Sequence, residues 1–283
     1  MVICAKFRQN HNISEWCEPV MMTTPTQRGD MFRLGRHVLM CGDATDAADM
    51  RKLMHRECGV RADIVFTSPP YNAGYLGIAG KPKHGKKYLH SEDSVGEDEY
   101  VEFLQKNLDL LFEHSHEIFY NISMLAGNKT AIAQILCNNR QHLKDVLYWF
   151  KTNALPPMQP GIVANDVEMI LVFGDDCSRR FRHPQFERGK CRSYVKGSNA
   201  RHNPYCDIHK ATFPLYLPKH HIENFTAPGD TVLDPFGGTG TTLIACEELD
   251  RKCRMMEIDP TYCDIIIERW EKLTGERAEK ITE

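Results

Sequence analysis

A rigid turn rich in hydrogen-bond acceptors follows a short apolar run. The run Ala62–Thr67 is largely β-branched and apolar, and it stops at a Ser-Pro-Pro-Tyr turn. Each proline holds the chain extended and removes one N–H donor, so the turn presents the serine hydroxyl and a backbone carbonyl as acceptors, beside an aromatic face. The candidate catalytic residues are therefore Ser68, Pro69, Pro70 and Tyr71.

Such a turn suits the activation of an aromatic amine. The lone pair of that amine is delocalised into its ring. Two acceptors on its N–H groups draw the lone pair out of conjugation, so that it can attack a methyl sulfonium in line. A base inside a duplex cannot reach the turn, so it must be flipped out and stacked, here on Tyr71. Taken alone, however, such a sequence is more often an ordinary rigid turn.

A glycine-rich turn near the C-terminus is the second chemical feature. The strand-like run Thr231–Leu233 leads into Asp-Pro-Phe-Gly-Gly-Thr-Gly-Thr-Thr at 234–242, and a helical stretch follows. Glycines let the backbone approach a ligand closely, and the N–H groups of the helix start favour an anionic group. Glu257, seventeen residues after Gly240, can accept hydrogen bonds from both hydroxyls of a ribose. The unit indicates a nucleoside-containing cofactor.

The glycine-rich turn differs from two common nucleotide-binding motifs. Leu243 stands where a GxGxxG motif has its last glycine, and the lysine of a P-loop is missing. Dinucleotides and triphosphates are therefore disfavoured. The alternative is a tight strand-to-helix turn that binds no ligand.

Alternating strands and helices must position these two turns. After a hairpin-like entry at 31–43 and a helix that begins near Thr45 and Asp46, strands are expected at 62–67, 117–123, 146–151, 168–173, 231–234 and 253–259. Helices are expected at 97–115, 130–143, 214–225, 241–249 and 260–273. The alternation predicts the fold class α/β, with a parallel, doubly wound, Rossmann-like sheet.

Composition divides the chain into four segments. Residues 1–28 lack periodicity and are expected to form an N-terminal arm. Residues 29–174 form the catalytic half of the main domain, and residues 209–283 form its cofactor-binding half. Residues 175–208 hold eight Lys or Arg against four Asp or Glu and few aliphatic residues, which indicates a small inserted region.

Charge and cysteine content restrict the partners and the compartment. The net charge is −3, so positive charge for a nucleic acid must be local. The eleven cysteines are scattered without a CxxC pair, and neither a secretory signal nor a membrane span is evident, so reduced thiols in the cytoplasm are expected. Zinc at Cys177, Cys191, Cys206 and His209 is an open alternative, disfavoured by their spacing, and no metal is expected.

The two turns together resemble the β group of DNA amino-methyltransferases, in which the catalytic motif precedes the cofactor motif in a circularly permuted order. The resemblance extends over residues 34–264. Five segments carry it: LGRH with CGD (34–43), ADIVFTSPPYN (62–72), HKATFP with LP (209–218), GDTVLDPFGGTGTT (229–242) and MEIDPTYCD (256–264).

The resemblance implies S-adenosyl-L-methionine as the cofactor. The matching cofactor-binding positions are Asp43, Phe213, Pro214, Asp234, Pro235, Phe236, Gly237, Gly238, Gly240, Thr241, Thr242 and Glu257. For Asp43 the alternative is a Gly-Asp turn that caps the next helix. For His209 a helix N-terminus or a satisfied core position is favoured over a direct catalytic role.

The basic segment Arg179–Arg201 of the inserted region stands where this family usually recognises its target. It is therefore expected to contact double-stranded DNA. A Lys-rich loop at 81–90 is a second candidate phosphate clamp. The expected DNA-binding residues are Lys81, Lys83, Lys86, Lys87, Arg179, Arg180, Arg182, Arg188, Arg192 and Arg201. The alternative is a solvated charged surface.

The serine of the first turn favours cytosine N4 over adenine N6 as the methylated group, in the way the family's motif variants suggest. A cognate restriction nuclease and a homodimer are further partners that the resemblance allows. Two alternatives remain. One is methylation of RNA or of a protein amide, although there the cofactor turn usually comes first; the other is a non-catalytic DNA-binding module.

Overall fold

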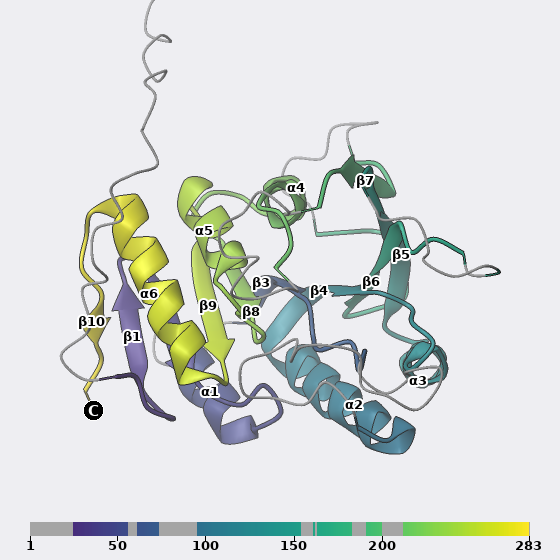
Figure 1. Cartoon of the computed structure of the whole chain (residues 1–283), viewed down its shortest axis with the longest axis horizontal. Coiled ribbons are helices and arrows are strands. Elements are labelled where there is room, and N and C mark those ends of the chain that lie inside the picture. The colour runs from purple at the N-terminus through teal and green to yellow at the C-terminus, as the bar shows by residue number, and fades with distance from the viewer. Residues whose placement is uncertain are drawn as a thin grey trace, which may run out of the picture.

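One sheet with helices on both faces makes up the part of the chain that can be described. The computed structural model describes residues 25–55, 61–73, 95–153, 161, 163–182, 191–199 and 212–282. Within these residues the sheet has ten strands (Figure 1). No helix in the described ranges has both the length and the apolar character needed to cross a membrane.

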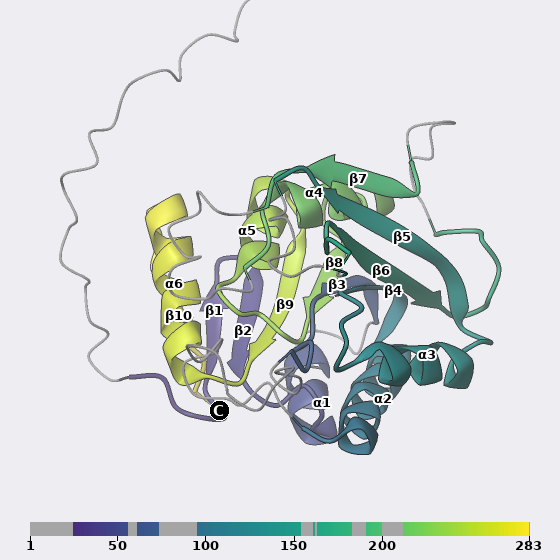
Figure 2. The ribbon, with the colours of Figure 1, turned by 45° about the vertical axis from the view of Figure 1, so that its right-hand side comes forward.

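The strands of this sheet come from both halves of the chain. They are β1 Met31–Leu34, β2 His37–Cys41, β3 Ala62–Thr67, β4 Ser115–Ile122, β5 Leu143–Lys151, β6 Val167–Gly174, β7 Tyr194–Gly197, β8 Thr231–Asp234, β9 Lys252–Glu257 and β10 Glu279–Lys280. Their order is β10-β1-β2-β9-β8-β3-β4-β6-β5-β7. In Figure 1 the labels β10, β1, β9, β8, β3, β4 and β6 follow this order from left to right, and Figure 2 labels β2 between β1 and β9. Strands β2, β9, β8, β3 and β4 run parallel, whereas β6 is antiparallel to both β4 and β5.

Six helices of the described ranges cover the two faces of the sheet. They are α1 Ala47–His55, α2 Glu97–His114, α3 Lys129–Asn138, α4 Tyr216–Phe225, α5 Thr241–Glu248 and α6 Pro260–Thr274. Buried residues of α4, α5 and α6 share one core with Ile64 and Phe66, and those of α1, α2 and α3 share the other with Val65. Because neighbouring residues of β3 point to opposite faces, both of its faces are covered, and the doubly wound α/β prediction is confirmed. The expectation of a parallel sheet holds for its centre but not throughout, since the pairs β1–β2, β1–β10, β4–β6 and β5–β6 are antiparallel.

The order of the strands determines where the Ser-Pro-Pro-Tyr turn and the glycine-rich turn meet. Strands β8 and β9, from the C-terminal half, lie between β2 and β3, from the N-terminal half. The carboxyl ends of β2, β9, β8, β3 and β4 therefore share one edge, which we call the carboxyl edge. In open α/β sheets, ligands bind at this edge.

Most expected elements are present, with two differences. The helix expected at 130–143 ends at Asn138, because the Asn139 side chain and backbone N–H both bond to the carbonyl of Ile135 and strand β5 begins at Leu143. The strands β7 and β10 were not expected, since both are short and at least half of their residues are polar.

Candidate functional site

The two predicted functional turns meet at the carboxyl edge. We call the Ser-Pro-Pro-Tyr turn, predicted to be catalytic, the catalytic turn, and the glycine-rich turn, predicted to bind the cofactor, the cofactor turn. Strands β3 and β8 are hydrogen-bonded neighbours, and their last residues are also joined by side chains: the Thr67 hydroxyl donates to Asp234 Oδ1 at 2.6 Å. Asp234 is buried, and burial raises its pKa to about 6. The two turns, far apart in sequence, thus form one continuous site.

The catalytic turn is held rigidly from α2 and α3. The Tyr100 hydroxyl donates to the carbonyl of Pro70 at 2.7 Å, and Asn128 Nδ2 donates to the carbonyl of Tyr71 at 2.7 Å. Asn72 has a φ of 54°, a left-handed conformation that asparagine tolerates. Its side chain bonds the backbone N–H and carbonyl of Val95 at 2.8 and 3.0 Å. The backbone of the turn from Pro70 to Asn72 is therefore held by three side chains.

Three polar side chains surround the tyrosine hydroxyl of the turn. Tyr71 Oη lies 2.9 Å from Ser68 Oγ and donates to Glu168 Oε2 at 2.9 Å. Asn121 Nδ2, at the end of β4, donates to Tyr71 Oη at 2.8 Å and to Glu168 Oε2 at 2.9 Å. Lys151, the last residue of β5, donates to Glu168 Oε1 at 2.9 Å. Hydrogen bonds thus connect Ser68 to the carboxylate of Glu168 through the hydroxyl of Tyr71.

Sequence reasoning did not find Asn121, Glu168 or Lys151. A signal exists in retrospect, since Asn121 interrupts the apolar run of β4 and Glu168 stands at the start of an apolar strand. In a strand buried on both faces, a polar residue needs a specific partner.

The cofactor turn is shaped by glycines and by α6. Gly238 and Gly240 have φ values of 52° and 80°, which favour glycine. A Cβ at Gly237 would lie 2.8 Å from the side chain of Met255 and 3.2 Å from the carbonyl of Met256, so the turn packs closely on β9. Arg269 donates to the carbonyl of Thr239 at 2.9 Å and so anchors the turn from the other side.

Glu257, the predicted ribose acid, lies directly beside this turn. Its carboxylate accepts hydrogen bonds from the backbone N–H groups of Gly238 at 2.7 Å and Asp259 at 3.0 Å. Only 7% of the residue is exposed, and burial raises its pKa to about 7. The acid and the glycine turn are therefore in direct contact.

The remaining predicted cofactor residues also gather at this edge. Thr212 Oγ1 lies 3.2 Å from Thr239 Oγ1, and Phe213 packs edge-on against Phe66 with ring centroids 5.8 Å apart. This brings the segment with Phe213 and Pro214 against the cofactor turn. Phe236 packs on Phe103 of α2 at 5.8 Å.

Asp43 follows β2 at the same edge, and it does not cap α1. Its Oδ1 accepts from the backbone N–H of Thr45 at 2.9 Å, whereas Asp46 accepts from the N–H groups of Ala48 and Asp49 at 2.7 and 2.9 Å. Asp43 therefore holds the turn before the helix, with its side chain 35% exposed.

Four arginines of the predicted DNA-binding set are described, namely Arg179, Arg180, Arg182 and Arg192. They lie near the edge of the sheet that is opposite the carboxyl edge. Arg179 donates to Asp145 at 2.9 Å, near the start of β5. Asp145 is six residues from Lys151, which corresponds to roughly 20 Å along a strand. A cavity of about 530 Å³ near this edge is lined by Arg179, Arg180 and Arg192, among other residues.

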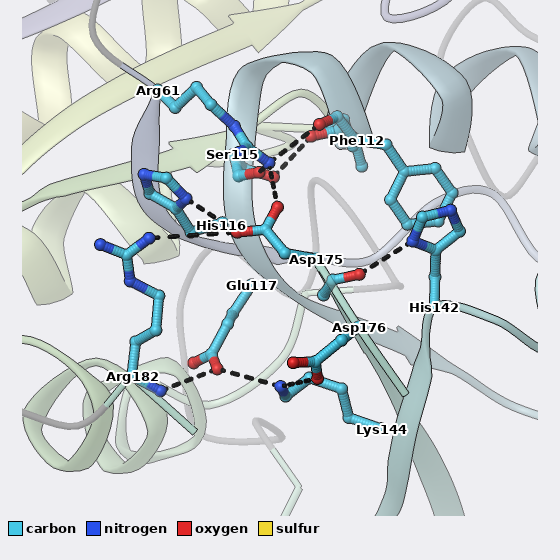
Figure 3. Close-up of polar contacts among 12 residues, drawn as sticks. Arg61, Phe112, Ser115, His116, Glu117, His142, Lys144, Asp175, Asp176 and Arg182 are labelled. Carbon is cyan, nitrogen blue, oxygen red and sulfur yellow. Dashed lines mark hydrogen bonds and ion pairs between the residues drawn. The ribbon is translucent and has the colours of Figure 1, made fainter. Parts of the chain in front are cut away.

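A buried charge cluster supports this opposite edge. The backbone N–H of Arg182 donates to Glu117 Oε1 at 2.9 Å, and Lys144 Nζ lies 3.7 Å from the same oxygen (Figure 3). Burial raises the pKa of Glu117. Arg61 and His116 point toward the Asp175 carboxylate. The segment that follows β6, residues 175–182, is thus fixed to β4 and β5, and its described arginines are not brought to the catalytic turn.

Several predicted positions lie outside the described residues. These are residues 1–24 of the predicted arm together with Lys81, Lys83, Lys86, Lys87, Arg188, Arg201, Cys206 and His209. Within the described ranges, no group of three or more His, Cys, Asp or Glu residues could hold a metal ion. Of the four candidate zinc ligands, Cys177 and Cys191 are described, as free thiols.

Curated relatives match the chain over part of their length. A type II methyltransferase of Citrobacter freundii, M.Cfr9I, is 29% identical over 151 residues, which is 51% of this chain and 50% of that protein. The type II methyltransferase M.SmaI of Serratia marcescens is 39% identical over 154 residues, covering 51% of this chain and 52% of that protein. The chain thus spans about half the length of the curated relatives it matches.

Solved structures share the fold at low sequence identity. The cytosine-N4-specific PvuII DNA methyltransferase superposes with a TM-score of 0.62 at 20% identity, covering 85% of this chain and 91% of that one. A putative DNA modification methylase of Thermus thermophilus, complexed with S-adenosyl-L-methionine, gives a TM-score of 0.56 at 21% identity, covering 86% of this chain and 96% of that one.

A family model described as DNA methylase, of the N6/N4 methyltransferases, matches residues 62–268. These bounds include both the catalytic turn and the cofactor turn with Glu257. Because the match spans well over half of the 283 residues, the chain belongs to the N6/N4 DNA methylase family.

Proposed function

We propose that the chain transfers a methyl group from S-adenosyl-L-methionine to an exocyclic amino group of a base in double-stranded DNA. One observation carries the proposal: the Ser-Pro-Pro-Tyr turn and the glycine turn with Glu257 share one edge, where Thr67 and Asp234 join them at 2.6 Å. Family membership supports the same activity.

The donor set of the cofactor turn fits S-adenosyl-L-methionine. The Glu257 carboxylate supplies acceptors for a ribose diol, and the backbone N–H groups at the start of α5 suit the carboxylate of the methionine part. When bound, this group supplies an electrophilic methyl on a sulfonium. Phe213 and Pro214, packed beside the turn, would close the cavity around the adenosine.

The catalytic turn is suited to hold the amine in line with that methyl. The Ser68 hydroxyl and a carbonyl of the Ser68-Pro69 segment would accept the two N–H groups, which localises the lone pair on nitrogen. The ring of Tyr71 would stack on the flipped base. Because Tyr100 and Asn128 fix the turn, these groups are preorganised.

We favour cytosine N4 over adenine N6 as the acceptor. Ser68 at the first position of the motif supports this choice, and the PvuII enzyme that shares the fold is described as cytosine-N4-specific. Adenine N6 is the alternative, because both amines need the same pair of acceptors.

The type II names of the relatives support a restriction-modification role, with a cognate nuclease as partner. A homodimer and a cytoplasmic location complete the proposal.

A transfer assay tests the proposal against its alternatives. Labelled S-adenosyl-L-methionine is incubated with the full chain and duplex DNA of varied sequence, and parallel reactions hold RNA or a protein acceptor. Transfer to DNA supports the proposed activity. Transfer to RNA or protein alone, or cofactor binding without transfer to any acceptor, contradicts it.

Cofactor affinity should depend on pH through Glu257. Its ionised form accepts both ribose hydroxyls, and its pKa is raised to about 7, so binding favours loss of that proton. The dissociation constant of S-adenosylhomocysteine should therefore fall as pH rises toward 7, by at most about tenfold per pH unit, and then level off. Calorimetry between about pH 5.5 and pH 8.5, at about half-unit steps, measures it. A wild-type profile as flat as that of Glu257→Gln contradicts the assignment.

Exposed arginines of the insertion should contribute to DNA binding through phosphates. Arg180 is exposed and has no partner among the described residues, in contrast to Arg179, which Asp145 holds. Arg180→Ala is expected to reduce the slope of log affinity against log salt by about one. Fluorescence anisotropy with duplex DNA measures the slope, and Arg140→Ala, an exposed arginine just after α3, is the matched control. An unchanged slope for Arg180→Ala would contradict a contact between Arg180 and a DNA phosphate.

A further inference from the structure

We infer that Glu168 is a positioning residue that orients the Ser68 hydroxyl through Tyr71 and receives the proton that the amine loses. The inference rests on the proposed function. We call Ser68 Oγ, Tyr71 Oη and Glu168 Oε2 the hydroxyl relay; its two successive distances are both 2.9 Å. The relay joins the turn after β3 to the start of β6 at the carboxyl edge.

The carboxylate sets the direction of every hydrogen in the relay. An ionised carboxylate only accepts hydrogen bonds, so the Tyr71 hydroxyl donates to Glu168. Tyr71 Oη is then an acceptor for its other neighbours. One is Asn121 Nδ2 at 2.8 Å, which can only donate, and the other is the Ser68 hydroxyl at 2.9 Å. The single hydrogen of Ser68 therefore points toward Tyr71. Its oxygen also accepts a long hydrogen bond from Asn121 Nδ2 at 3.4 Å, and one lone pair remains for the N–H of the amine.

Lys151 and Asn121 hold the carboxylate in place. Lys151 Nζ donates to Glu168 Oε1 at 2.9 Å, and both side chains are only 12% exposed. Asn121 Nδ2 donates to Glu168 Oε2 at 2.9 Å from the end of β4. Each oxygen of Glu168 is thus bound on one side, and a mostly buried negative charge is compensated by a neighbouring positive one.

The transfer step balances with Glu168 as the final acceptor. The amine lone pair forms the new N–C bond, and the methyl–sulfur bond breaks with its electron pair left on sulfur. The nitrogen then releases a proton to Ser68 Oγ, Ser68 passes its own proton to Tyr71, and Tyr71 passes its own to Glu168. The positive charge of the methyl donor and the negative charge of Glu168 cancel, which leaves a neutral carboxylic acid.

Glu168→Gln removes the proton acceptor while it preserves shape. The single-turnover rate of methyl transfer, with cofactor and DNA saturating, is expected to fall by about 10²-fold, while both affinities stay within about twofold. Tyr71→Phe keeps the ring and should lose the same factor. The double variant should be no slower than either single variant, because both changes cut one relay. Glu102→Gln, an exposed carboxylate on α2, is the matched control and should retain the wild-type rate.

A second measurement, by NMR, tests the hydrogen bonds of the relay without measuring methyl transfer. In a chain labelled with ¹³C at the tyrosine ring carbon that bears the hydroxyl, the Tyr71 resonance, assigned with Tyr71→Phe, should move in Glu168→Gln, because the Tyr71 hydroxyl loses its charged acceptor. The same resonance should stay in place in Glu102→Gln. If it moves in Glu168→Gln but the wild type transfers no methyl group, the proposed function fails while the relay stands. An unmoved Tyr71 resonance in Glu168→Gln, a Glu168→Gln rate within about threefold of wild type, or additive losses in the double variant would overturn the inference.

Discussion

Ser68→Ala is expected to lower the rate constant of methyl transfer by about 10²- to 10³-fold, the cost of removing one preorganised hydrogen-bonding group at a reacting centre. In the proposed mechanism the hydroxyl is the acceptor that draws the amine lone pair out of conjugation, and Tyr71 Oη lies 2.9 Å from it. The cofactor dissociation constant should stay nearly unchanged, since we propose that Glu257 and the glycine turn bind that group. Tyr71→Ala should have a similar effect on transfer, with the stacking surface lost as well. Single-turnover kinetics and calorimetry measure the two quantities.

A structural control accompanies these two variants. Their melting temperatures and cofactor affinities should match those of the wild type, because Pro70 and Asn72 keep the turn attached to Tyr100 and Val95. Loss of cofactor binding in both variants would show that the division between the two turns is wrong.

Glu257→Ala is expected to raise the cofactor dissociation constant by about 10²-fold or more, because two charge-assisted hydrogen bonds to the ribose are removed, together about 3 kcal/mol or more. The rate constant at saturating cofactor should change much less. The effect is on binding because Glu257 lies at the end of β9, next to Gly238 and away from the catalytic turn. Calorimetry with S-adenosylhomocysteine measures it.

Two controls separate binding from folding in this variant. The backbone N–H groups of Gly238 and Asp259 lose their acceptor in Glu257→Ala, so Glu257→Gln, which keeps one oxygen, is compared with it. Glu248→Ala, at an exposed carboxylate of α5 that pairs with Lys219, is the matched control and should bind the cofactor normally. A dissociation constant near that of the wild type for Glu257→Ala would remove this residue from the cofactor site.

Features that depend on local sequence were predictable. The β-branched run before Ser68 identified β3, and the glycines before Thr241 identified the turn into α5. The helix α6 begins where Pro260 follows Asp259, whose side chain accepts from the N–H of Thr261. In each case a few neighbouring residues determine the geometry, so the motif carries its own structure.

Contacts that depend on strand order were not predictable. Asn121, Lys151 and Glu168 meet because β6 runs antiparallel between β4 and β5. Periodicity identifies a strand but gives neither its neighbour nor its direction. The register places Ile170 opposite Asn121 and Glu168 opposite Trp149, which brings the polar ends of three strands to one place. A single sequence does not encode this register in any short motif.

The insertion illustrates the same limit. Its basic composition predicted a DNA surface, but the position of that surface depends on where β6 ends. Gly174 pairs with Glu117 at the start of β4, so Asp175 and the following arginines begin at the edge opposite the catalytic turn. Charge composition alone does not tell at which edge of the sheet the arginines lie.

The identity of the methylated nucleoside tests the central claim most directly. Unmethylated duplex DNA of varied sequence is incubated with the full chain and labelled S-adenosyl-L-methionine, digested to nucleosides and analysed by mass spectrometry, with Ser68→Ala in parallel. We predict labelled N4-methylcytosine with the wild type and nearly none with Ser68→Ala. N6-methyladenine would support the transfer but contradict the choice of base. No labelled nucleoside, in a sample that binds the cofactor tightly, would contradict the account.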